Sequence, residues 1–190
     1  MLVSQLITVN LELEFMNKYT ISVLIENKFG SFNRVGSMFT GRGFNIHSIS
    51  IGETENPEIA RMTFVTSGDE KVIDQIIKQL NRLIDTIHVE NLTDQPMVER
   101  ELSLITVFYH KENRADITNI CNIFQGKVVD ITNTTITLEI TGPPDKTEAA
   151  INLLSHYGIK EVARSGKVAL KRGKQEKAKS NDELLMNSAG

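Results

Sequence analysis

The sequence contains a single cysteine, Cys121, and no tryptophan among its 190 residues. One cysteine excludes an internal disulfide framework and every zinc or iron–sulfur pattern that needs several cysteine ligands. The four histidines lie far apart, without the spacing of a metal-binding motif. We therefore expect no metal and no cofactor on this chain, and Cys121 is predicted to be a small core residue. The histidines are His47, His88, His110 and His156.

Long hydrophobic runs and a strong net charge are also missing. No apolar run approaches the ~18 residues that a membrane-spanning helix needs. The N-terminus lacks the basic start of a secretory signal, and Glu12 and Glu14 interrupt its apolar stretch. A formal net charge of −3 gives no electrostatic reason to expect a nucleic acid partner. We expect a cytoplasmic protein that binds neither membranes nor nucleic acid.

The first half of the chain shows the strand and helix patterns of a ferredoxin-like unit. Residues 19–25 form a β-rich run that stops at the turn Asn27–Gly30. A helix is expected after this turn, because apolar side chains recur at i, i+3, i+4 and i+7. Two strands, a second helix and a last strand then complete the order β-α-β-β-α-β. These elements are the helix with Phe32, Val35, Gly36 and Phe39, strands 44–51 and 60–66, the helix with Val72, Ile73, Ile76, Ile77 and Leu80, and strand 84–91.

The same order recurs in the second half, although the residues barely match those of the first half. The fold class predicted is therefore α+β, with two ferredoxin-like (βαββαβ) domains in tandem. The expected elements are strand 102–109, a helix with Ile117, Ile120, Cys121 and Phe124, strands 127–131 and 135–140, a helix through Ala150, Leu153 and Leu154, and strand 159–163.

Changes in composition and clusters of turn-forming residues divide the chain into five segments. Residues 1–18 alternate apolar and polar side chains from Val9 to Phe15, as an extra edge strand or a poorly ordered leader would. The end of the chain is charged and poor in apolar residues, so we predict a disordered tail. The predicted segments are an N-terminal extension 1–18, a first domain 19–93, a linker 94–99, a second domain 100–173 and a tail 174–190.

The turn from Asn27 to Gly30 is the main candidate for a binding site. A helix that opens at Gly30 presents free backbone N–H groups, which suit a small carboxylate. The same two residues also make a good turn without any ligand, and both interpretations stay open. Asn45 is a polar amide at the head of a strand that we expect to be buried. It would need partners, which a ligand or a facing subunit could provide.

No pattern of nucleophile and base accompanies this turn. Gly41-Arg42-Gly43 follows a helix instead of opening one, so it is neither a dinucleotide-binding loop nor a P-loop. RNA binding on this fold needs exposed aromatic side chains in a basic strand, and residues 60–66 offer Phe64 alone. A small enzyme stays a minor alternative, because a site can be assembled from scattered residues.

Several segments, in order and at matching spacing, resemble the small, regulatory subunits of acetolactate synthase (acetohydroxyacid synthase), which begin with an ACT domain. The resemblance spans about residues 19–173. It is carried by Val23–Gly30 (VLIENKFG), Arg42–Ile46 (RGFNI), Ala60–Thr63 (ARMT), Gly68–Lys71 (GDEK), Gln75–Leu80 (QIIKQL), Val98–Leu102 (VEREL), Ile123–Asp130 (IFQGKVVD) and Val162–Gly166 (VARSG).

The resemblance implies a non-catalytic chain that activates a separate catalytic (large) subunit and confers feedback inhibition by valine. Thiamine diphosphate, Mg and FAD are then expected only on that catalytic subunit. ACT domains of this family pair as a homodimer and bind the amino-acid effector between two chains. Matching positions give the effector-binding residues Asn27, Gly30, Ser31, Phe32, Asn45 and Ile46. The alternative function is a free-standing ACT-type amino-acid sensor that acts on another enzyme or on transcription.

Overall fold

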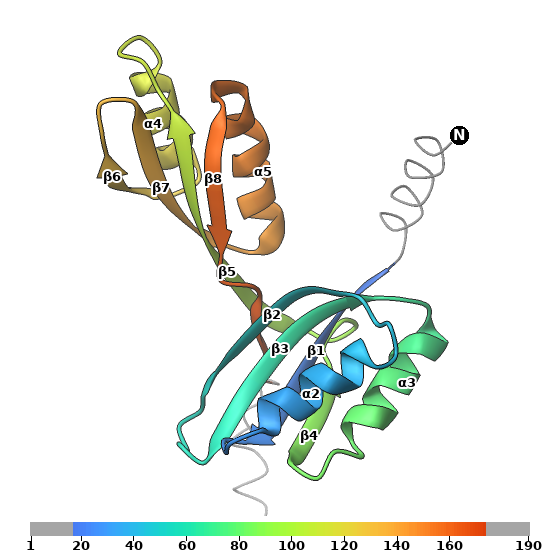
Figure 1. Cartoon of the computed structure of the whole chain (residues 1–190). Coiled ribbons are helices and arrows are strands. Elements are labelled where there is room, and N and C mark those ends of the chain that lie inside the picture. The colour runs from blue at the N-terminus through green and yellow to red at the C-terminus, as the bar shows by residue number, and fades with distance from the viewer. Residues whose placement is uncertain (1–16, 174–190) are drawn as a thin grey trace, which may run out of the picture.

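The computed structural model describes residues 17–173, which form two α+β units joined by a two-stranded neck (Figure 1). The first unit has the order β-α-β-β-α-β predicted from the sequence. Its elements are β1 (Lys18–Glu26), α2 (Ser31–Thr40), β2 (Ile46–Glu53), β3 (Ile59–Ser67), α3 (Glu70–Leu80) and β4 (Thr86–Asn91).

The first sheet has the strand order β2-β3-β1-β4, and both helices lie on one of its faces (Figure 1). All three neighbouring pairs are antiparallel. Along β1, the buried side chains Ile21, Val23 and Ile25 point toward the helices and alternate with residues on the opposite face. The order places β2 and β4 at the two edges of the sheet.

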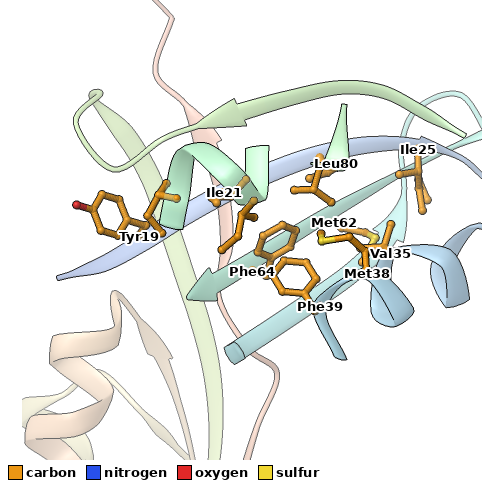
Figure 2. Packing of buried hydrophobic residues seen from close by; sticks show 13 residues of the cluster. Tyr19, Ile21, Ile25, Val35, Met38, Phe39, Met62, Phe64 and Leu80 are labelled. Carbon is orange, nitrogen blue, oxygen red and sulfur yellow. The ribbon is translucent and has the colours of Figure 1, made fainter. Parts of the chain in front are cut away.

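The core of the first unit fills the space between this sheet and its helices (Figure 2). Phe64 is fully buried and meets the ring of Phe39 edge to face, with ring centroids 4.8 Å apart. Met38 of α2 and Leu80 of α3 close the layer from the helix side. This packing holds α2, and therefore the turn before it, against the middle of the sheet.

The second unit repeats the same architecture, so the predicted fold class of two ferredoxin-like domains is confirmed. Its sheet has the order β6-β7-β5-β8, and α4 and α5 cover one face. Ile117 and Cys121 of α4 and Ala150 and Leu154 of α5 are buried against it. The elements are β5 (Met97–Phe108), α4 (Arg114–Ile123), β6 (Lys127–Ile131), β7 (Thr135–Gly142), α5 (Pro144–Leu154), the 3₁₀ turn η1 (Ser155–Tyr157) and β8 (Ile159–Arg164).

The neck differs from the linker expected at residues 94–99. Residues 97–99 belong to the long strand β5. The first part of β5 pairs with β9 (Val168–Lys171), a strand that the sequence does not predict. Strand pairing gives the backbone groups of residues 97–99 hydrogen-bond partners that a free linker would leave to water. The chain thus crosses between the units twice, side by side.

One detail of α2 also differs from the expected apolar stripe. Phe32 lies on the expected stripe but keeps 47% of its surface exposed, whereas Met38 lies outside that stripe and is buried. Phe32 lies in the first turn of the helix, where the helix leaves the sheet. The predictions for the N-terminal extension and for the tail concern residues that lie, apart from Asn17 and Lys18, outside the described ones.

Candidate functional site

The turn between β1 and α2 is held in an unusual backbone conformation by Gly30. Its φ angle is +88°, in the left-handed region, and it precedes the first helical residue. The N–H of Ser31 donates to the carbonyl of Lys28 at 3.2 Å, and the N–H of Arg34 donates to the carbonyl of Gly30 at 3.0 Å. Within residues 17–173, the N–H groups of Phe32 and Asn33 have no acceptor. The helix therefore presents two free donors, which suit a carboxylate.

Asn27 is bound to the neighbouring β2–β3 turn. Its backbone N–H donates to the Glu58 carbonyl at 2.7 Å. Its side-chain Nδ2 donates to the Pro57 carbonyl at 2.8 Å and to Glu53 Oε1 at 3.3 Å. The amide N–H groups are thus engaged within the chain, and Asn27 lines a surface hollow of about 580 Å³ beside this turn.

The turn rests on Asp85, a nearly buried carboxylate just before β4. Arg34 donates through Nε to Asp85 Oδ2, and the Lys28 ammonium lies 3.3 Å from Asp85 Oδ1. The Arg34 guanidinium, followed by the Lys28 ammonium, holds the pKa of Asp85 below its usual value, although burial opposes this. The N–H of Glu26 also donates to the backbone carbonyl of Asp85. Asp85 therefore fixes both ends of the turn.

Ser31 and Phe32 differ sharply in their surroundings. Ser31 is 2% exposed, and its hydroxyl has no hydrogen-bond partner in the described chain. Phe32 and the fully exposed Phe29 instead present apolar surface to the outside of the turn. A site at this turn would combine backbone N–H donors with aromatic walls, which suits a small molecule that has a carboxylate and an apolar side chain.

Asn45 and Ile46 lie where β2 begins. The expectation that Asn45 heads a buried strand is wrong, because β2 is an edge strand and the Asn45 side chain is exposed. Its backbone carbonyl accepts a hydrogen bond from the Thr66 hydroxyl at 2.6 Å. Ile46 is half-buried and packs against the core of the first unit. Among residues 17–173 the Asn45 amide makes no hydrogen bond, so it is available to a partner.

One chain does not bring these two groups of residues together. The start of β2 is level with the start of β1, since Ile46 and Tyr19 both face Thr66 on β3. The turn follows the far end of β1, where Glu26 faces Ile59. Thr66 and Ile59 are seven residues apart on β3, which corresponds to about 23 Å of strand. A site that contains both Asn27 and Asn45 needs a second chain.

Cys121 and His47 lie away from the turn between β1 and α2. Cys121 is buried in the core of the second unit, and burial raises the pKa of its thiol. His47 bonds to the Ser67 hydroxyl at 2.9 Å, and burial followed by Lys18 lowers the pKa of its ring. Residues 17–173 contain no group of three or more His, Cys, Asp or Glu side chains that could hold a metal ion. Among the helices in this range, none is long and apolar enough to cross a membrane.

Sequence reasoning missed two parts of this region. The bond from Arg34 to Asp85 joins residues 51 positions apart, and no local sequence pattern predicts such a pair. The bond from Asn27 to Glu53 was missed for the same reason. The available signal was a pair of charges of opposite sign near the ends of a strand and a helix, which is common in unrelated proteins.

Comparisons with known proteins match both units. A family model described as the AHAS small subunit-like ACT domain matches residues 21–88, and a model described as the small subunit of acetolactate synthase matches residues 100–173. A probable acetolactate synthase small subunit from Archaeoglobus fulgidus is 49% identical over 159 residues, which cover 84% of this chain and 99% of that protein.

Two further relatives are also acetolactate synthase small subunits. The acetolactate synthase small subunit of Bacillus subtilis is 42% identical over 165 residues, covering 86% of this chain and 96% of its own. The crystal structure of the small subunit from Thermotoga maritima superposes with a TM-score of 0.76 at 38% identity, covering 84% of this chain and 99% of that one. Sequence and structure therefore point to the same family over both units.

Proposed function

The chain belongs to the family of acetolactate synthase small subunits, and we propose that it activates a catalytic large subunit and makes it sensitive to feedback inhibition by valine. Family membership supports a regulatory, non-catalytic role and a large subunit as partner. The observation that carries the effector proposal is the helix start after Gly30, with its two free N–H groups beside apolar surface.

A branched-chain amino acid has three features that this region can meet. Its carboxylate suits the N–H groups of Phe32 and Asn33 at the start of α2, where the helix dipole also favours negative charge. Its ammonium suits the side-chain oxygens of Asn27 and of a facing Asn45. Its apolar side chain would lie against Ile46. Leucine and isoleucine have the same polar groups, so valine is distinguished only by the size of the apolar pocket.

The effector site is proposed to form between two copies of this chain. The outer edge of β2 has no strand partner within the described residues, and Ile49 and Ile51 on this strand are exposed. Antiparallel pairing of β2 with its copy across a two-fold axis would merge two sheets. The start of β2 in one chain would then lie opposite its end in the other, where Glu53 accepts from Asn27.

Such pairing would bring Asn45 and Ile46 of one protomer toward the turn at Asn27 and Gly30 of its partner. An effector held between two chains stabilises the dimer by mass action, which couples its concentration to the quaternary state. We propose that thiamine diphosphate, Mg and FAD belong to the catalytic subunit, as the family resemblance implies. The described residues offer no acidic cluster for a metal.

The alternative of a free-standing ACT-type sensor is less well supported. A free-standing sensor would have a second half unrelated to that of acetolactate synthase small subunits. Residues 100–173 instead match the family model of that subunit. A pull-down with the large subunit separates the two. Retention of the large subunit together with a rise in its activity supports the proposed function, and failure to bind and activate it rejects that function.

The effector site is tested by Asn27→Ala and Asn45→Ala. Each should abolish valine inhibition while sparing activation, because each removes a polar contact to the effector and neither lies in a core. Asn122→Ala, at an exposed position on α4, is the matched control. Titration calorimetry of the dimer with valine, leucine and isoleucine ranks the effectors. Unchanged inhibition in both variants would rule out the proposed site.

A further inference from the structure

The neck between the two units contacts the middle of β2 at one short segment, Gly166 and Lys167, which we call the clamp. These residues connect β8 with β9 (Figure 1). Just before them, Ser165 is bound to β5: its N–H donates to the Leu102 carbonyl, and its hydroxyl accepts from the Leu102 N–H. The clamp thus lies where the second unit ends and the neck begins.

Lys167 contacts the first sheet through its backbone and its side chain. Its N–H donates to Ser48 Oγ at 2.9 Å, and its carbonyl accepts from Ser50 Oγ at 2.7 Å. Its ammonium donates to Thr20 Oγ1 at 3.2 Å and forms an ion pair with Glu99 at 2.7 Å. Because the Lys167 side chain is only 14% exposed, water screens this ion pair less than a surface pair.

Gly166 makes this close approach possible. Its φ angle is +79°, and a Cβ atom there would lie 2.5 Å from the carbonyl oxygen of Ile49. Any other residue would push the neck away from β2 as well as strain the backbone. On the far side of the neck, Lys171 pairs with Glu90 of β4 at 2.6 Å. The neck therefore spans the face of the sheet opposite the helices.

The clamp contacts the middle of β2, the strand that begins at one half of the proposed effector site and is hydrogen-bonded at its end to the other half. Asn45 and Ile46 lie at the start of β2, and Glu53 at its end accepts from Asn27. Between them, Ser48 and Ser50 are the residues that hold Lys167. Two hydrogen bonds and the close approach of Gly166 join β2 to the clamp, and the Lys167 ammonium joins it to Thr20 of β1 and to Glu99 of the neck.

The clamp is also rigidly connected to the second unit. β9 pairs with residues 97–100 of β5, and the rest of β5 is a central strand of the second sheet. A small shift of the clamp therefore turns the whole second unit, since packed sheets move as bodies. Strand pairing is continuous along this route, from β9 to β5 and from β5 to the rest of the second sheet.

We propose that the Gly166–Lys167 clamp is the connection through which effector binding at the first unit changes the position of the second unit, and so the activity of the bound large subunit. This inference rests on the proposed effector function. It predicts that effector binding and inhibition can be separated by substitutions that are remote from the effector contacts.

Gly166→Ala and Lys167→Met test the clamp in the complex reconstituted with the large subunit. The first forces β2 and the neck apart, and the second removes the ammonium but keeps the aliphatic stem. Gly52→Ala is the matched control, because Gly52 lies on β2, the strand that the clamp contacts, and its added Cβ meets nothing within 4 Å. Valine affinity is measured by calorimetry on each chain, and valine inhibition is measured on each complex.

Both clamp variants should bind valine within about twofold of the wild-type affinity, whereas half-maximal inhibition should need about tenfold more valine. Gly52→Ala should behave as the wild type. Hydrogen exchange gives a second readout: valine should slow exchange in β2 and β9 of the wild type, but only in β2 of the variants.

Wild-type inhibition in both variants would overturn the clamp as the connection. Loss of valine binding in both variants would overturn it as well, because the segment would then support the site itself. If Gly166→Ala does not fold, Lys167→Met decides by the same criteria. A wild-type chain that binds no valine would instead reject the proposed effector, and this coupling with it.

Discussion

Replacing Gly30 and Gly36 by alanine should change stability in opposite directions, although the two residues lie within two turns of each other. Gly30 has a φ angle of +88°, whereas Gly36 lies inside α2. A side chain in the left-handed region costs about 1–2 kcal/mol, of which the stiffer unfolded chain returns about 0.4–1 kcal/mol. Gly30→Ala should therefore destabilise the first unit by about 1 kcal/mol. No steric clash adds to this cost, because the new Cβ meets only the Arg34 guanidinium, at an ordinary 3.4 Å.

Gly36→Ala should stabilise the protein by about 0.5–1 kcal/mol, since alanine is the better helix former. A Cβ at Gly36 meets nothing within 4 Å, so no clash opposes this gain. In thermal unfolding followed by circular dichroism, the melting temperature should fall by about 4–8 °C for Gly30→Ala and rise by a few degrees for Gly36→Ala.

The same pair of variants also tests the effector site. Relief of the strain at Gly30 would rotate the following peptide and re-aim the free N–H groups of Phe32 and Asn33. Loss of one charge-assisted hydrogen bond corresponds to at least about tenfold weaker valine binding. Gly36→Ala should bind valine as the wild type does. Equal or greater stability of Gly30→Ala relative to Gly36→Ala would refute the left-handed turn and the argument built on it.

Two further predictions concern single titratable groups. Because Arg34 and Lys28 lower the pKa of Asp85, its ion pairs stabilise the turn at neutral pH, and this contribution is lost as the pH falls through that lowered pKa, below 3.8. Asp85→Asn should thus melt lower than the wild type at pH 7 but approach it as the pH falls through the lowered pKa of Asp85; a constant difference would contradict the assignment. The buried thiol of Cys121 should react with Ellman's reagent only as fast as the second unit unfolds, and rapid labelling of the native protein would show it to be accessible.

The order of strands and helices could be predicted from the sequence because it is encoded locally. The apolar period of α3, with Ile73, Ile76 and Leu80 buried, is complete within eleven residues. The left-handed turn at Gly30 follows from the two residue types that tolerate it, in the place where a strand must become a helix. Neither conclusion needs any knowledge of the rest of the chain.

The environment of Asn45 could not be predicted in this way. Whether a strand lies at the centre or at the edge of a sheet depends on which strands pair, and the residues of β2 do not determine its partners. Strand β9 was missed for a related reason. Its four residues are too short for a period, and only the pairing with the beginning of β5 identifies them as a strand.

Strand β2 has two edges and one open face, and each is used differently. Its inner edge pairs with β3, its outer edge is open to a second copy, and its face away from the helices holds the clamp through Ser48 and Ser50. Because side chains alternate along a strand, the serines and the isoleucines Ile49 and Ile51 must point to opposite faces. The proposed dimerisation would use the outer edge of β2, whereas the neck contacts the hydroxyls of Ser48 and Ser50. Each can change the position of β2 without competing with the other, which is the physical requirement for coupling between an effector at the dimer interface and the second unit.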